Sequence, residues 1–375
     1  MDRLALYIHI PWCVRKCPYC DFNSHERRDA LPETAYIDSL MRDLQHERDL
    51  AGDRSVSSVF FGGGTPSLFS AEAIGRILTE ARQIFRFSLD CEITLEANPG
   101  TFEADKFAGF RKAGVNRLSI GVQSFDSHQL TQLGRIHNAD EAKRAIQSAR
   151  EVGFDNINID IMHGLANQSV EEALDDLRSA IRFNPEHLSW YQLTIEPNTV
   201  FYKKPPTLPD IDALSDIEEA GFKLLRESGY HQYEVSAWSK SGRESQHNLS
   251  YWYFADYIGI GAGAHGKLTH NGIAERHRKT RKPEDYLRDS VESAKRWVVT
   301  NDDLVFEYFL NRLRLFTPIF FNEFEAATQL SFEVCRDTCV ALESRGLIKL
   351  GRDCFELTSV GRRFLNDVQS AFLRD

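Results

Sequence analysis

Short apolar runs alternate with amphipathic stretches along residues 4–194, and this alternation limits the folds that the chain can adopt. The apolar runs, which we expect to form strands, are residues 4–8, 57–61, 91–96, 117–121, 156–162 and 188–194. The stretches between them place apolar residues at helical spacing, for example at 33–49, 70–85, 103–113, 139–152 and 169–182. Strands joined by helices pair in parallel through right-handed crossovers. The pattern predicts an α/β fold, either a full or partial barrel or an open doubly wound sheet.

Polar and glycine-rich residues follow the expected strands, and their positions favour the barrel. These residues are the segments 13–20 and 62–65, together with Glu96, Gln123 and Asp160. In a barrel the carboxyl ends of the strands meet on one face, where active sites are built. We therefore expect a partial (β/α)6 barrel over residues 1–235, with a functional site on that face.

The pattern changes after residue 235. Residues 236–300 contain the motifs HNLSYW and GIGAGAH, and we expect this segment to connect two domains. Residues 301–375 show three helix-like stretches, an expected hairpin and a last helix, which is the order of a small α+β winged-helix-like domain. That domain carries nine Lys and Arg against twelve Asp and Glu. DNA-binding surfaces are basic, so we expect the domain to be a packing or partner-binding module instead.

The composition excludes several classes of protein. No apolar run approaches the ~18 residues that a membrane helix needs, and the start MDRLALYIHIPWC lacks the features of a signal peptide, so we expect a cytoplasmic protein. A net charge of -10 argues against a nucleic-acid partner. Seven cysteines, an odd number in a reducing compartment, favour metal or cluster ligation over disulfides.

Three cysteines, Cys13, Cys17 and Cys20, follow the first expected strand with the spacing CxxxCxxC. A structural zinc ion or an electron-transfer cluster takes four protein ligands, so three cysteines leave one metal position open. Either a fourth residue such as His9 or His25 completes a zinc site, or the metal binds a small ligand. A 4Fe-4S cluster on three thiolates has one iron free for the amine and carboxylate of S-adenosylmethionine (SAM).

The cysteine motif, followed by GGGTP after the second expected strand, resembles the radical SAM superfamily. The segments YIHIPWC, FFGGGTPS, TLEANPG, GVQSFD, LGRIH and NIDIMHGL resemble the branch that contains oxygen-independent coproporphyrinogen III dehydrogenase (HemN) and the HemW heme chaperones. This resemblance implies a 4Fe-4S cluster on Cys13, Cys17 and Cys20. It also implies a SAM site formed by Tyr7, Tyr19, Gly63, Gly64, Thr65, Glu96, Gln123, Arg135 and Asp160. Glycines admit close backbone approach, carboxylates accept from amine and ribose, and arginine pairs with a carboxylate.

Two departures separate the chain from the dehydrogenase pattern. Phe22 stands where the dehydrogenase has a fourth cysteine, and only six residues precede Tyr7 where the dehydrogenase has a long extension. HNLSYW matches the H-N-x-x-Y-W motif of the HemW group and implies heme binding by His247, Asn248, Tyr251 and Trp252. An imidazole beside aromatic rings supplies an axial donor and an apolar wall for heme. His231 and His265 stay open as alternative iron ligands.

The resemblance implies a heme-binding chaperone on a radical SAM scaffold that delivers heme to apo-hemoproteins such as respiratory enzymes, with peripheral association at the inner face of the membrane. The alternative is a radical SAM oxidoreductase that acts on a tetrapyrrole, so whether the protein is an enzyme stays open. A homodimer is a further open alternative. For Cys335, Cys339 and Cys354, a second metal site competes with burial as small apolar residues.

Overall fold

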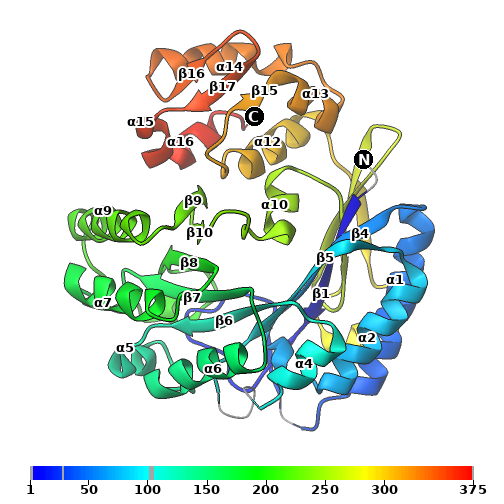
Figure 1. Ribbon diagram of the computed structural model, residues 1–375. Coiled ribbons are helices and arrows are strands. Elements are labelled where there is room, and N and C mark those ends of the chain that lie inside the picture. Colours follow the sequence, from blue (N-terminus) through cyan, green and yellow to red (C-terminus); the bar gives the residue numbers. More distant parts are fainter. Residues whose placement is uncertain (1–2, 28, 101–104, 374–375) are drawn as a thin grey trace.

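One curved sheet of twelve strands, with helices along its outer side, forms most of the molecule (Figure 1). The computed structural model describes residues 3–27, 29–100 and 105–373. Six neighbouring strands run parallel in the order of the chain: β1 (Arg3–Ile10), β4 (Ser55–Gly63), β5 (Phe87–Ala97), β6 (Arg117–Gln123), β7 (Ile157–His163) and β8 (His187–Gln192). A doubly wound sheet reverses its strand order at a switch point, so this order excludes that alternative. The prediction of a partial barrel is confirmed.

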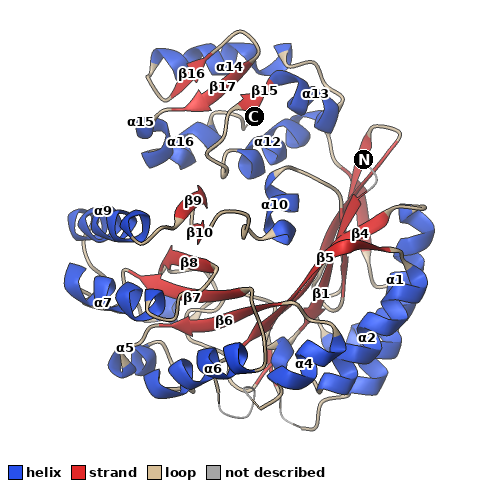
Figure 2. Ribbon diagram, in the orientation of Figure 1, coloured by secondary structure: helices blue, strands red, loops and turns tan. Residues whose placement is uncertain are grey.

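The parallel strands are rich in apolar residues because both of their faces are covered. Leu6, Ile8, Val59 and Phe61 are fully buried in the resulting core. The outer face packs against α1 (Glu33–Ala51), α2 (Ala71–Ile84), α4 (Phe107–Ala113), α6 (Ala139–Glu151) and α7 (Val170–Ile181), as Figure 2 shows. The helix expected at 103–113 begins at Phe107, and residues 103 and 104 lie outside the described residues.

Residues 236–300, which we expected to connect two domains, also contribute strands near both edges of the sheet. At one edge β10 (Ala237–Ser239) joins β8, and β9 (His231–Glu234) joins β10. At the other edge β11 (Tyr257–Ile260) runs parallel to β1, followed by antiparallel β12 (His265–His270), β13 (Ile273–Arg278) and β14 (Lys295–Val298). GIGAGAH forms the tight turn from β11 to β12, and a Cβ on Gly259 would lie 1.8 Å from the His265 carbonyl oxygen.

The C-terminal residues form a small domain with its own aromatic core, which includes Phe309, Phe324 and Phe355. Its three helices are α12 (Asn301–Arg312), α13 (Phe321–Thr328) and α14 (Glu333–Ser344). A three-stranded sheet of β15 (Ile319–Phe320), β17 (Cys354–Leu357) and β16 (Ile348–Leu350) follows the order of a winged helix. The expected last helix is divided into α15 (Ser359–Arg363) and α16 (Leu365–Ser370).

Two ion pairs connect this domain to strands at or next to the two edges of the open sheet. Arg314 pairs with Glu234 of β9 at 2.9 Å, and Glu307 of α12 pairs with Arg276 of β13 at 2.6 Å. The domain therefore lies across the opening between the two edges. The remaining helical segments are η1 (Pro66–Leu68), α5 (Ser127–Gln132), α8 (Val200–Lys203), α9 (Ile211–Glu227), α10 (Gln246–Trp252) and α11 (Pro283–Arg288). In the described part of the chain, no helix combines the length and apolar character needed to cross a membrane.

Candidate functional site

The three cysteines lie on a loop that follows the carboxyl end of β1. The loop is closed at its base by β2 (Trp12–Cys13), which pairs with β3 (His25–Glu26). Cys13 is buried, while Cys17 and Cys20 are half-buried, and the amide of Cys20 donates to the Cys17 carbonyl at 3.1 Å. Burial raises the pKa of the Cys13 thiol. A metal cluster that takes up the thiolates would offset this penalty.

Polar donors approach two of the sulfurs. Arg135 Nη1 lies 3.6 Å from Cys17 Sγ, and Ser24 Oγ lies 3.7 Å from Cys20 Sγ. Hydrogen bonds to the sulfurs of an iron-sulfur cluster help to set its reduction potential. Arg135 and Ser24 lie where they would donate to the sulfurs of a cluster bound at Cys17 and Cys20.

The donor set does not match a zinc site completed by His9 or His25. His9 has both ring nitrogens engaged, with Tyr7 Oη at 2.9 Å and the Asn23 carbonyl at 2.9 Å. His25 Nε2 lies 3.1 Å from the Arg281 carbonyl. Within the described residues, no three His, Cys, Asp or Glu side chains are grouped to hold a single metal ion. Each thiolate of a 4Fe-4S cluster binds a different iron, so a cluster fits the three cysteines better than zinc.

The glycine loop after β4 lies directly against the cysteine segment. Gly63 has a φ of 118°, and its amide donates to Glu96 Oε2 at 3.2 Å. The amide of Gly64 donates to the Ile10 carbonyl at 2.8 Å, and a Cβ at this position would lie 2.5 Å from the Trp12 carbonyl oxygen. Only glycine fits here, because any side chain would collide with the backbone of the segment that leads into the cysteine loop.

A cavity of about 350 Å³ lies between the cysteine loop, the glycine loop and the carboxyl ends of β5 to β8. Its lining includes nearly all of the expected cluster and SAM residues: Cys13, Cys17, Cys20, Tyr19, Gly63, Gly64, Thr65, Glu96, Gln123, Arg135 and Asp160. This volume is within the range of small-molecule sites. Tyr7 is the exception, because it lines a neighbouring cavity and hydrogen-bonds His9.

The cavity holds two carboxyl groups whose pKa values are raised. Burial, with a contribution from the charge of Asp160, raises the pKa of Glu96 to about 8. Burial also raises the pKa of Asp160, although Ser119 and Asn158 donate to this carboxylate at 3.0 and 2.8 Å. A cationic ligand would favour the charged form of both groups. SAM carries a sulfonium and an ammonium, so the electrostatics of the cavity suit it.

Arg135 offers the complementary charge for a carboxylate. Its Nη2 donates to Asn98 Oδ1 at 2.7 Å and to the Gly121 carbonyl at 2.8 Å, which orients the guanidinium. Its Nε is buried and has no partner among the described residues. A donor held in place without an acceptor fits the carboxylate end of an amino-acid ligand.

Sequence reasoning missed several residues of this cavity, among them Asn98, Ser119 and Tyr191. Asn98 donates to Thr65 Oγ1 at 3.0 Å, and Tyr191 donates to Gln123 Oε1 at 2.7 Å. The signal for Asn98 was present, because it stands two positions after Glu96 and alternate residues of a strand share one face.

A larger cavity of about 550 Å³ adjoins the first one, and Phe22, Gly63, Glu96 and Trp252 line both. Its walls are aromatic, with Tyr7, Tyr251, Trp252, Phe254 and Tyr257. The expected heme residues are divided between the two cavities. Trp252 lines both of them, Tyr251 lines only the larger one and Asn248 only the smaller one.

His247 lines neither of the two cavities, so its expected role in heme binding stays a prediction. Its side chain is buried, with Nδ1 3.0 Å from Ser58 Oγ and Nε2 2.8 Å from Tyr251 Oη. Burial and the charge of Arg117 lower the pKa of His247 to about 3. With both ring nitrogens engaged, His247 anchors α10 to β4 and orients Tyr251.

The two other histidines named as alternatives lie in different surroundings. His231 pairs with Glu244 at 2.7 Å on β9, and it lines neither of the two cavities. His265, at the start of β12, lines the larger cavity. Of the three histidines, His265 alone reaches a cavity wide enough for a large ligand.

The cysteines of the C-terminal domain do not form a comparable loop. Cys335 and Cys339 are buried on α14 within the aromatic core, and Cys354 is half-buried on β17. Burial raises the pKa of Cys339, which keeps it a neutral thiol. Their environment matches that of small apolar core residues.

Comparisons with known proteins agree with this arrangement. The model of the radical SAM superfamily matches residues 7–178, and that of the HemN C-terminal domain matches residues 299–364. The heme chaperone HemW of Haemophilus influenzae is 50% identical over 380 residues, which covers 100% of this chain and 99% of that protein. The heme chaperone HemW of Escherichia coli is 50% identical over 376 residues, with the same coverage.

Among solved structures, coproporphyrinogen III oxidase (HemN) from Escherichia coli superposes with a TM-score of 0.82 and 24% sequence identity. The match covers 99% of this chain and 90% of that chain, and at this identity it supports the fold alone. The similarity to the chaperones is higher and spans both domains. The chain therefore belongs to the radical SAM superfamily and, within it, to the HemW family of heme chaperones.

Proposed function

We propose that the protein is a heme-binding chaperone, built on a radical SAM scaffold, that delivers heme to apo-hemoproteins. The observation that carries the proposal is the aromatic cavity of about 550 Å³ beside the cysteine loop. Large ligand sites are concave and combine apolar walls with polar groups that orient the ligand, and this cavity has aromatic side chains on one side and basic ones on another. The names of the relatives with 50% identity point to the same function.

The smaller cavity is proposed to hold SAM above a 4Fe-4S cluster on Cys13, Cys17 and Cys20. When bound, these two groups supply one-electron chemistry. The chain itself contributes the close backbone at Gly64, the free donor of Arg135 and the carboxyl group of Glu96. Because Gly63, Glu96 and Trp252 line both cavities, occupation of the SAM site has a direct route to the heme site. We propose that the cluster and SAM regulate heme loading or release.

The proposal includes heme acceptors such as respiratory enzymes, and a cytoplasmic site of action with peripheral association at the membrane.

The alternative function is a radical SAM oxidoreductase acting on a tetrapyrrole. Phe22 bears on the choice, since this residue is 62% exposed and lines both cavities. A phenylalanine at this point offers an apolar contact to a macrocycle and no thiol for chemistry.

The test is a heme titration of the anaerobically reconstituted protein, followed in the Soret band. We expect saturable binding close to one heme per chain, and an unsaturable, linear increase would contradict the proposal. Incubation of the same preparation with coproporphyrinogen III, SAM and reductant separates the alternatives. Formation of protoporphyrinogen would identify the oxidoreductase, whereas the proposed chaperone leaves the substrate unchanged.

A further inference from the structure

One face of the β12–β13 hairpin is basic, and it lines the larger cavity. His265 lies directly opposite Arg278, and Lys267 lies directly opposite Arg276. Alternate residues of a strand point to the same face, so these four side chains share one. All four line the cavity of about 550 Å³, facing the aromatic side chains of its other wall.

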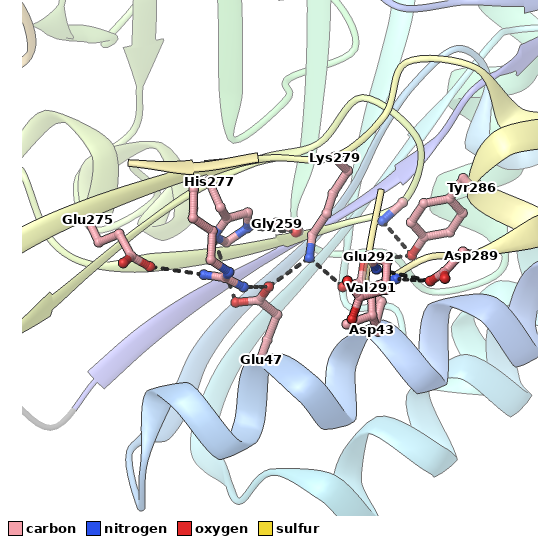
Figure 3. A network of polar contacts seen from close by, with 12 residues as sticks. Asp43, Glu47, Gly259, Glu275, His277, Lys279, Tyr286, Asp289, Val291 and Glu292 are labelled. Atoms are coloured by element: carbon pink, nitrogen blue, oxygen red, sulfur yellow. Dashed lines mark hydrogen bonds and ion pairs between the residues drawn. The ribbon is translucent and has the colours of Figure 1, made fainter. Parts of the chain in front are cut away.

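The opposite face of the hairpin holds it in this orientation. His277 and Lys279 alternate with the cavity residues and point toward α1, as Figure 3 shows. Lys279 Nζ donates to Glu47 at 2.7 Å and also binds Asp43, while His277 hydrogen-bonds the Gly259 carbonyl at 3.1 Å. A shift of one residue in register would break these contacts and turn His277 and Lys279 toward the cavity, so the basic face is fixed.

The charges in the cavity are not balanced. Lys267 pairs with Asp256 at 2.8 Å, and Arg276 pairs with Glu307. For Arg278 and Arg281, by contrast, no acidic side chain within the described ranges forms an ion pair. Both side chains are exposed at the edge of the cavity. A guanidinium binds a carboxylate through two parallel hydrogen bonds. Two unpaired guanidinium groups beside aromatic walls therefore suit a ligand that has an apolar, conjugated body and two carboxylates.

We infer that this cavity binds heme through its two propionates, held by Arg278 and Arg281, with the iron facing His265. The inference rests on the proposed function and names the part of the chain that would perform it. His265 is exposed to the cavity, and the described residues contain no hydrogen-bond partner for its ring. Its pKa is lowered by partial burial and by the charges of Arg278, Arg276 and Arg281. The ring is therefore neutral at pH 7, which is the form that binds iron.

The test compares heme with heme dimethyl ester, which has the same macrocycle and iron without the two negative charges. Arg278→Ala and Arg281→Ala should each weaken heme binding about tenfold, the loss expected for one charged hydrogen-bonded pair. Neither variant should change the affinity for the ester. Arg352→Ala, which removes an exposed arginine from the hairpin of the C-terminal domain, is the matched control and should bind heme as the wild type does.

A second readout identifies the iron ligand. His265→Ala should shift the Soret maximum of the heme complex, whereas the buried His247→Ala should leave its position unchanged. If the wild type binds heme saturably but does not distinguish it from the ester, and both arginine variants match the wild type, the inference is wrong while the proposed function stands. If the wild type shows no saturable heme binding, the proposed function fails and the inference fails with it.

Discussion

Replacing Lys279 with methionine should lower the free energy of unfolding by about 3–5 kcal/mol, because it removes the cation between two buried carboxylates. The side chains of Asp43, Glu47 and Lys279 have no exposed area, and Lys279 Nζ contacts both carboxylates (Figure 3). Methionine fills a similar volume, so the loss comes from charge and not from a void. Glu47 keeps Arg296 as a partner, whereas Asp43 keeps, among the described residues, only the hydroxyl of Tyr286 at 2.7 Å.

The loss should depend on pH with a definite sign. Burial raises the pKa of Asp43 to about 6 even with Lys279 beside it, and without this cation the pKa rises further. Unfolded Asp43 has an ordinary pKa of about 4 and loses its proton above that pH. In the folded variant Asp43 keeps its proton up to a higher pH. Stability therefore falls as the pH rises from the unfolded pKa through the folded one. The difference from the wild type should be smallest near pH 4 and largest above neutral pH.

Urea unfolding of the ligand-free protein, followed by far-UV circular dichroism at several pH values, measures both effects. Lys282→Met is the matched control, because Lys282 is an exposed lysine three positions away. Its unfolding free energy should stay within about 0.5 kcal/mol of the wild type. Equal losses in the two variants, or a loss in Lys279→Met that does not vary with pH, would refute the reasoning.

Three further predictions concern the two cavities. SAM affinity should rise with pH up to about 8 and level off above it, because the positively charged SAM favours the ionised form of Glu96, whose pKa in the ligand-free protein is about 8. Calorimetry in buffers of different ionisation enthalpy should show that the wild type releases a proton when SAM binds. The Glu96→Gln variant should release no such proton. His247→Ala should lower the free energy of unfolding by about 1–3 kcal/mol, because it leaves the hydroxyl groups of Ser58 and Tyr251 without their partner. If the variant also lost the heme Soret band, His247 would be the iron ligand. Gly64→Ala should abolish SAM binding in equilibrium dialysis, since the new Cβ would lie 2.5 Å from the Trp12 carbonyl oxygen. Gly75→Ala on α2 is the control, because its Cβ has room, and this variant should bind SAM normally. Retained binding by Gly64→Ala would contradict the proposed fit.

The parallel strands and the winged-helix order were predictable because each strand of a buried parallel sheet is a short apolar run bounded by an amphipathic helix. The residues at the ends of these strands could be assigned to one site, since barrel topology brings the ends together. Glu96, Gln123 and Asp160 do line one cavity. The strands in 236–300 were not predictable, because they are short and pair with partners far away in the sequence, such as β11 with β1.

The residues that line the larger cavity could not be predicted from the sequence. The motif HNLSYW identified residues that occur together, but burial decides which of them line a cavity, and His247 lines neither of the two. The basic face formed by His265, Lys267, Arg276 and Arg278 can be recognised only when the register of β12 and β13 is known. Whether an arginine is free or neutralised depends on Glu307, which belongs to the other domain.

Heme transfer to an apo-hemoprotein tests the central claim most directly. The heme-loaded protein is mixed anaerobically with increasing concentrations of the acceptor, and the Soret spectrum of the acceptor gives the transfer rate. A heme chaperone should transfer heme at a rate that rises with acceptor concentration and exceeds the spontaneous release of heme into an excess of scavenger. A rate equal to spontaneous release and independent of acceptor concentration would contradict the account.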